Sequence, residues 1–333
     1  MTEGAIFRLA SITKPIVAAA TMRLVEQGTM SLNDPVTRWL PDFRPRLPNG
    51  EAPTILVRHL LTHTAGLSYR FREPQDSPYH RLNVSDGLDQ LGLSMEENLR
   101  RLAAAPLLSA PGATWRYSLA MDVLGAAAAK AAKASLPELV SEFVLDPLGM
   151  TDTGFLVRDP SRLVTPYADG AREPVRMTED MAVPITTIPD LPPDAAVRFA
   201  PSRAFDPASY PSGGAGMAGT APDFLRFLEA IRLGGAPILQ PETVAQMTSD
   251  QVGAQAQTQG PGWGFGYGWA VLVDRTLAGA LQGPGTRQWG GVYGHSWSVD
   301  PTRALSVVAF TNTAIEGMNG RFVVDLRNAI FGA

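Results

Sequence analysis

The sequence contains no cysteine in 333 residues, which excludes disulfides, thiolate metal sites and cysteine nucleophiles. It also has no excess of positive charge. Its 28 Lys and Arg stand against 32 Asp and Glu, and a net charge of -4 provides no field to attract nucleic acid or an anionic membrane. No apolar run approaches the roughly 20 residues of a membrane-spanning helix. We therefore expect neither a nucleic-acid partner nor a membrane partner.

Several targeting and catalytic signals are missing as well. The N-terminal stretch is short and acidic, whereas a secretory signal peptide has a basic region followed by an apolar one. This predicts a cytoplasmic protein. No Gly-x-Ser-x-Gly motif occurs, and this argues against an α/β-hydrolase. His59 and His63 have helical i, i+4 spacing, but the residue after the first histidine is Leu60, where a zinc protease requires glutamate. We expect no metal and no cofactor.

The pattern of apolar residues predicts both helices and strands. Helices are expected at 12–28, 55–63, 95–106, 118–148, 220–233 and 319–331, and strands at 263–274, 292–299 and 305–312. A Pro-rich stretch at 159–215 is predicted to be irregular and to wrap around the fold. The predicted fold class is α/β (α+β), with a single domain over 1–333. Residues 1–30 and 235–333 would form an antiparallel sheet with flanking helices, 31–234 a mainly helical part, and the active site would lie between them.

The strongest chemical signal is the pair Ser11 and Lys14. Residues three apart share one face of a helix, so the hydroxyl and the amine can meet. Pro15 is tolerated only in a first helical turn, so the helix should begin beside Ser11, where free backbone N–H groups point. A neutral Lys14 would then accept the proton of Ser11. The spacing alone favours the plainer alternative, in which Ser11 is a helix cap and Lys14 a solvated residue.

Four stretches follow one another in an order shared by the β-lactamase-like serine hydrolases. They are Phe7–Pro15, His59–Leu67, Pro111–Met150 with Trp115-Arg116-Tyr117-Ser118-Leu119, and Trp289–Trp297. Together they resemble the family VIII carboxylesterases, bacterial esterases with the class C β-lactamase fold. The several tens of residues that normally precede the nucleophile, an N-terminal helix and two strands, are absent from this sequence. The resemblance therefore implies a sheet of about three strands with an exposed edge, which a second copy of the chain would cover in a homo-oligomer.

The resemblance implies a role for each matching residue. Ser11 would be the nucleophile, and Lys14 and Tyr117 would share the general-base and general-acid work. The backbone N–H groups of Ser11 and Val292 would form the oxyanion hole. The expected reaction is hydrolysis of a short-chain carboxylic ester through an acyl-enzyme on Ser11.

The substrate pocket would be lined by Trp115, Leu119, Trp289, Gly290 and Gly291. Two departures from the β-lactamases bear on the substrate. Leu119 stands where those enzymes usually have asparagine, and Trp289-Gly290-Gly291 stands where they have Lys-Thr-Gly. In β-lactamases, that asparagine amide and that lysine cation would bind the amide and the carboxylate of a β-lactam. The Trp289 indole offers instead an apolar wall and one N–H donor. Uncharged small-molecule esters are therefore favoured over penicillins.

Three alternatives stay open at this point. The chain could have β-lactamase or penicillin-binding activity, it could transfer its acyl group to an alcohol, or it could be a catalytically impaired relative shortened at the N-terminus. Two aromatic residues, Tyr69 and Phe71, fit an acyl-pocket wall as well as they fit the core. The glycine-rich run Ser212–Gly216 is predicted to be a tight turn packed beneath the active site.

Overall fold

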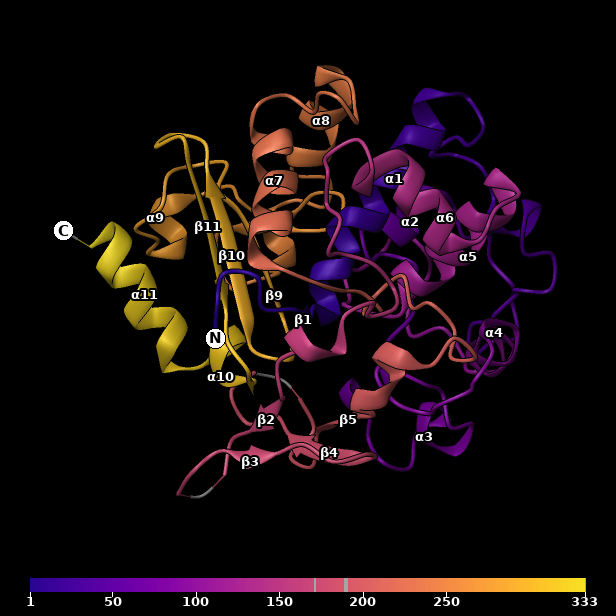
Figure 1. Cartoon of the computed structure of the whole chain (residues 1–333). Coiled ribbons are helices and arrows are strands. Elements are labelled where there is room, and N and C mark those ends of the chain that lie inside the picture. Colours follow the sequence, from indigo (N-terminus) through magenta and orange to yellow (C-terminus); the bar gives the residue numbers. More distant parts are fainter. Residues whose placement is uncertain (171, 189–190, 333) are drawn as a thin grey trace.

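A five-stranded antiparallel sheet forms the centre of one half of the molecule (Figure 1). The computed structural model describes residues 1–170, 172–188 and 191–332. Its sheet has the order β11-β10-β9-β8-β7. The strands are β7 (Trp263–Phe265), β8 (Ala270–Leu272), β9 (Arg287–Gly291), β10 (His295–Asp300) and β11 (Leu305–Phe310). The predicted α/β class is thereby confirmed.

The sequence analysis was wrong about the number and bounds of the strands. The expected strand at 263–274 is a hairpin of two strands, because the chain turns at Gly268, which has a positive φ of 99°. The expected strand at 292–299 starts only at His295. Residues between Gly291 and His295 form a tight turn in which Gly294 N–H donates to Gly291 O at 2.8 Å. Glycines make both turns, and the pattern of apolar residues does not indicate where such turns fall.

Two long helices lie against the sheet or beside it. Helix α1 (Thr13–Glu26) is surrounded by the sheet half and by the helical half, where it contacts α5 (Ala120–Ala132) and α6 (Leu136–Val140). Helix α7 (Ala221–Arg232) packs Phe224 against Trp297 and Phe310 of the sheet, with ring centres 5.7 Å and 6.2 Å away. The prediction placed α7 in the mainly helical part, but this apolar contact makes it a layer of the sheet.

The helical half is built from shorter elements than the periodicity predicts. The stretch expected to be helical over 118–148 is divided between α5 and α6, because Lys133 adopts a left-handed conformation and Ser135 caps the next helix. A π-helical turn at Ser141–Leu145 continues α6. The other helices are α2 (Val57–Leu61), α3 (Pro78–Arg81), α4 (Met95–Ala104), α8 (Pro241–Thr248), α9 (Arg275–Ala278), α10 (Glu316–Asn319) and α11 (Arg321–Phe331).

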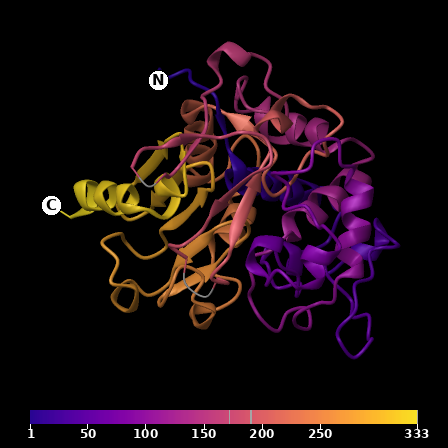
Figure 2. The same cartoon turned by 90° about the horizontal axis from the view of Figure 1, so that it is seen from below.

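The Pro-rich segment contains short strands that the sequence did not predict. They are β2 (Tyr167–Ala168), β3 (Val175–Arg176), β4 (Met181–Pro184) and β5 (Ala196–Phe199), of which β4 and β5 form a hairpin. Strand β6 (Ala218–Gly219) follows shortly after this segment. Strand β6 pairs with β1 (Phe7–Arg8), and β2 pairs with β12 (Thr313–Ala314). The Pro-rich segment and β6 thus pair with strands near the two ends of the chain, and Figure 2 shows the pink segment lying beside the yellow C-terminal part.

The outer side of the sheet is open at β11. Among the described residues, no strand pairs with β11 beyond β10. Helix α11 lies outside this region of the sheet (Figure 1) and exposes apolar side chains such as Val324. In the described part of the chain no helix combines the length and the apolar character needed to span a bilayer. The location in the cell stays a prediction.

Candidate active site

The segment that carries Ser11 is held from both sides. Strand β1 pairs with β6, and the next residue, Leu9, donates its N–H to Met217 O at 2.8 Å. Ala10 then takes a left-handed conformation with φ 47°, which starts a 3-10 turn over Ala10–Ile12. The Thr13 hydroxyl accepts the N–H of Met217 at 3.1 Å. Ser11 is therefore fixed at the start of α1, as the sequence predicted from Pro15.

The structure brings the three predicted catalytic side chains together. Lys14 Nζ donates to Ser11 Oγ at 3.0 Å, and the Tyr117 hydroxyl donates to the same oxygen at 2.7 Å. Lys14 is fully buried, and its Nζ also donates to Gly214 O at 2.7 Å. Nζ lies 4.7 Å from the centre of the Tyr117 ring. Ser11 Oγ thus lies within hydrogen-bond distance of two groups that can accept or return a proton.

Aromatic side chains fix the position of the Tyr117 phenol. The Trp289 indole N–H donates to the Tyr117 hydroxyl at 3.3 Å. The rings of Tyr69 and His63 lie against the Tyr117 ring, with centres 5.1 Å and 4.9 Å away. Burial raises the pKa of Tyr69 well above its usual value of 10, so this neighbouring phenol stays protonated. Tyr117 is the phenol whose hydroxyl donates to Ser11 Oγ.

The glycine-rich turn lies directly beneath Lys14, as predicted. A Cβ on Gly214 would overlap the buried carboxylate of Asp122, so only glycine fits beside that group. Asp122 accepts the Ser212 hydroxyl at 2.6 Å, and burial raises its pKa to about 6 although the charge of Lys14 opposes the shift. Sequence reasoning missed Asp122 and the role of the Gly214 carbonyl. The run of glycines was the one available signal.

Strand β9 approaches the nucleophile closely. A Cβ on Gly291 would overlap Leu9 O, so the absence of a side chain permits this approach. Val292 follows in the turn after β9, is buried, and lines the same cavity as Ser11. Gly290 lines the cavity as well, whereas Gly291 packs against the nucleophile segment. The two predicted oxyanion-hole residues, Ser11 and Val292, thus line the same cavity.

That cavity has a volume of about 1000 Å³ and is lined mainly by apolar side chains. Aromatic residues form one wall, namely Tyr69, Phe71, Trp115, Trp263 and Trp289. Ile185, Ile188 and Val197 of the β4–β5 region contribute another wall. Leu119, which was predicted to line the pocket, is instead fully buried in the core. The chain turns into α5 at this residue, so the alternation of a strand that would direct it toward the substrate has already ended.

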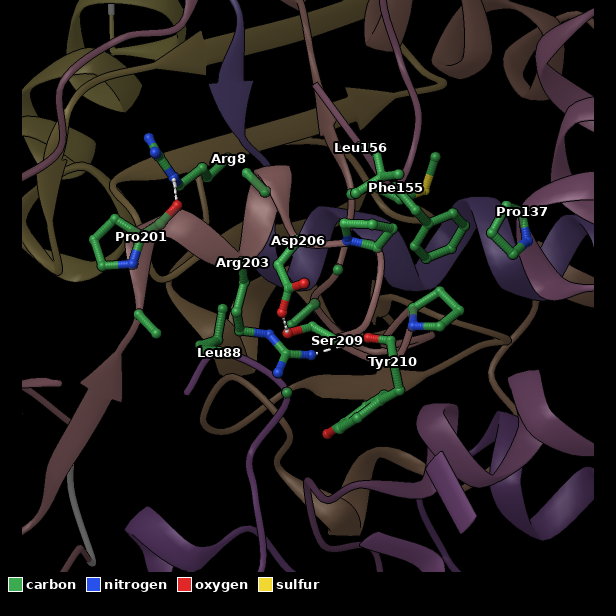
Figure 3. A pocket seen from close by; sticks show the side chains of 18 of the residues that line it. Arg8, Leu88, Pro137, Phe155, Leu156, Pro201, Arg203, Asp206, Ser209 and Tyr210 are labelled. Carbon is green, nitrogen blue, oxygen red and sulfur yellow. Dashed lines mark hydrogen bonds between the residues drawn. The ribbon is translucent and has the colours of Figure 1, made fainter. Parts of the chain in front are cut away.

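A second, smaller cavity of about 120 Å³ lies behind the nucleophile segment (Figure 3). Leu88 and Ala215 line both cavities. Its charged side chains are bonded to the protein itself: Arg203 donates to Tyr210 O at 2.9 Å, and Asp206 accepts the Ser209 hydroxyl at 2.6 Å (Figure 3). These side chains are therefore already engaged in holding the surrounding loops together.

The two histidines form hydrogen bonds within the protein. The structure directs His59 Nδ1 to the N–H of Leu56 and His63 Nδ1 to Ser118. Within residues 1–170, 172–188 and 191–332, no group of three His, Asp or Glu side chains has the arrangement of a metal centre. Both histidines bond to the backbone through Nδ1.

The comparisons with known proteins agree with this geometry. The model of the family described as Beta-lactamase matches residues 1–327. The chain belongs to the β-lactamase family. "Esterase EstB" from Burkholderia gladioli is 54% identical over 335 residues, which covers 99% of this chain and 83% of that protein. Protein Rv1367c of Mycobacterium tuberculosis is 34% identical, over 92% of this chain and 77% of that protein.

Solved structures give the same result. The structure titled "EstCE1, a hydrolase with promiscuous acyltransferase activity" has a TM-score of 0.95 and 50% identity, over 100% of this chain and 86% of that chain. Unliganded simvastatin synthase (LovD) from Aspergillus terreus has a TM-score of 0.74 at 22% identity, over 100% of this chain and 84% of that chain, which shows a shared fold. The predicted resemblance and the prediction of an enzyme of the hydrolase type are confirmed.

Proposed function

We propose that this protein is a carboxylesterase that hydrolyses short-chain esters of uncharged molecules through an acyl-enzyme on Ser11. The observation that carries the proposal is the convergence of Lys14 Nζ and the Tyr117 hydroxyl on Ser11 Oγ, at 3.0 Å and 2.7 Å. The likeness to EstB and EstCE1, which are named as an esterase and a hydrolase, supports the same reaction class.

In the proposed mechanism Ser11 Oγ attacks the carbonyl carbon of the ester. Its proton passes to Lys14 or Tyr117, and the departing alcohol takes a proton from Tyr117. The negative oxygen of the tetrahedral intermediate would accept hydrogen bonds from the N–H groups of Ser11 and Val292. A water molecule, deprotonated by the same pair, then attacks the acyl-enzyme and releases the carboxylic acid. Ser11 regains its proton, so the cycle is balanced.

The lining of the cavity supports uncharged substrates. Trp289 stands beside Ser11 and donates its indole N–H to Tyr117, so it supplies no positive charge for a substrate carboxylate. Trp115 and Phe71 add apolar surface to the same cavity. These contacts favour esters over penicillins, which carry a carboxylate.

The test is the turnover of p-nitrophenyl butyrate by the parent, Ser11→Ala and Tyr117→Phe. We expect Ser11→Ala to lose at least about 10³-fold in kcat and Tyr117→Phe at least about 10²-fold. A phosphonate inhibitor should label Ser11, as mass spectrometry of the digested protein would show. Parental activity in Ser11→Ala would disprove the mechanism.

Acyl transfer to an alcohol is a second candidate function. The large apolar cavity favours it, because an organic alcohol can compete there with water for the acyl-enzyme. The printed description of EstCE1 names an acyltransferase activity of that protein. Addition of a short alcohol should then raise the rate of p-nitrophenol release and yield a new ester. An unchanged rate with acid as the sole product would reject acyl transfer.

A further inference from the structure

The second histidine of the His59–Leu67 motif, His63, contacts the site, although the proposed mechanism gives it no role. His63 follows α2 in a left-handed conformation with φ 55° and is fully buried. Its ring centre lies 4.9 Å from that of Tyr117 and 5.4 Å from that of Phe265. A buried histidine in this position either fills the core or holds a neighbour in place.

The hydrogen bonds of His63 involve the residues on both sides of Tyr117. Arg116 donates its N–H to His63 O at 2.9 Å, and Ser118 donates its N–H to His63 Nδ1 at 3.2 Å. The Ser118 hydroxyl lies 3.3 Å from the same Nδ1. One residue thus fixes the backbone before and after the phenol that contacts Ser11.

The bond from the Ser118 N–H also determines the tautomer of the ring. Because Nδ1 accepts this hydrogen bond through its lone pair, it carries no proton, and the ring proton of neutral His63 resides on Nε2. This Nε2–H meets no hydrogen-bond acceptor among the described residues. Burial and the nearby positive charge of Lys14 hold the pKa of His63 well below 6.5, so the ring stays neutral and Nδ1 stays an acceptor.

We infer that His63 is a positioning residue for Tyr117: its Nδ1 and its carbonyl hold the backbone of Arg116 and Ser118 so that the phenol stays on Ser11 Oγ. The inference rests on the proposed role of Tyr117. A displacement of about 1 Å in such a group lowers the rate by about 10²-fold. Removal of the acceptor should therefore lower kcat and leave KM nearly unchanged.

Two substitutions at this position separate the acceptor from the bulk of the ring. Asparagine places its Oδ1 where Nδ1 lies and tolerates a left-handed backbone, and glycine tolerates the backbone but has no acceptor. We expect His63→Asn to keep at least about a third of the parental kcat, and His63→Gly to lose about 30-fold to 100-fold. Added imidazole should restore part of the activity of His63→Gly. Ser118→Ala, which removes one donor and leaves His63 intact, should lose about 3-fold to 10-fold.

A double-mutant cycle with Tyr117→Phe tests whether His63 acts through Tyr117. In the Tyr117→Phe background, His63→Gly should change kcat by less than about 2-fold, because the positioned group is already gone. An equal loss in both backgrounds, or a loss in His63→Asn as large as that in His63→Gly, would overturn the inference. If His63→Gly does not fold, the kcat values of His63→Asn and Ser118→Ala, alone and with Tyr117→Phe, decide it. Full activity of Tyr117→Phe would instead refute the proposed function.

Discussion

Helices α1 and α11 have similar lengths and opposite surroundings. In α1, 11 of 14 residues are buried, including the charged Lys14. In α11, Phe331 is the single buried residue of 11. Helix α1 is enclosed by both halves of the molecule, whereas α11 lies at the margin beyond the sheet (Figure 1).

The difference shows where the fold specifies chemistry and where it merely covers a surface. Around α1, each contact of Lys14 has a defined partner and distance, and the Ala18–Ala20 run lets neighbouring elements approach. Around α11, side chains such as Val324 and Ile330 remain 51% and 36% exposed, although they also line the large cavity. We therefore expect substitutions near the start of α1 to have large effects on catalysis and substitutions on α11 to have small ones.

The largest effect is expected for Lys14→Met. Methionine fills nearly the same volume but provides no donor for Ser11 Oγ and Gly214 O, which now lie at 3.0 Å and 2.7 Å from Nζ. We expect kcat to fall by about 10³-fold or more. The unsatisfied carbonyl of Gly214 should also lower the free energy of unfolding by about 1–3 kcal/mol. Turnover of p-nitrophenyl butyrate and thermal unfolding measure the two. A kcat within 10-fold of the parent would remove Lys14 from the mechanism.

A smaller loss is expected for Gly291→Ala, which tests the approach of β9 to the start of α1. The new Cβ would overlap Leu9 O and displace the strand that carries Val292. We expect kcat to fall by about 10²-fold. Gly154→Ala is the matched control, because its Cβ would meet no atom closer than 3.9 Å. Equal kcat values for the two variants would show that this close contact is not needed.

Next comes the buried carboxylate of Asp86, which accepts the N–H groups of Arg70 and Phe71 beside the cavity. Burial raises the pKa of Asp86 to about 7, against 3.8 for an exposed aspartate. Between these values the folded state binds more protons than the unfolded state, so this group lowers stability as the pH rises. Relative to Asp86→Asn, the parent should lose about 2 kcal/mol of unfolding free energy between pH 5 and pH 7.

Urea unfolding of both proteins at several pH values measures this difference. The asparagine variant has one side-chain acceptor fewer at every pH, so its absolute stability is not the relevant quantity. A pH-independent difference between parent and variant would contradict the raised pKa.

The smallest effects are expected on the outer side. Val324→Lys on α11 should change the unfolding free energy by less than about 0.5 kcal/mol, because Val324 is already 51% exposed.

A second copy is predicted to cover the free edge of β11, so light scattering should give the mass of two chains. Val307→Lys on this edge strand should reduce it to one, since lysine disfavours pairing at an edge. A parent with the mass of one chain would refute the predicted homo-oligomer.

Local sequence patterns predicted much of the fold, because the buried face and the ends of some helices are determined by residues within those helices. The apolar face and Pro15 define α1, and Thr220 before Pro222 defines the start of α7. The β4–β5 hairpin escaped prediction because its strands are short and lie in a Pro-rich segment. Its stability comes from partners such as Tyr293, which contacts Phe199 at 4.8 Å between ring centres from far along the chain.

The candidate site was likewise predicted in its local motifs and missed in its contacts between distant segments. Ser11, Lys14 and Tyr117 were predicted from motif spacing and family resemblance. Asp122 and the Gly214 carbonyl were not, because their relation to Lys14 spans 108 and 200 positions and depends on how α1, α5 and the glycine turn pack. Leu119 was assigned to the pocket by resemblance, but the helix that starts there turns it into the core. Contacts between distant segments exist only once the fold has formed.

The burial of Lys14 has a practical consequence for attaching the protein to a solid support. The sequence has three lysines, and the other two, Lys130 and Lys133, are exposed near the end of α5. Amine-reactive resins should therefore couple through these two side chains and the N-terminal amine, and spare Lys14. Because two of these three points lie at one helix end, most bound molecules would share an orientation without any engineered tag.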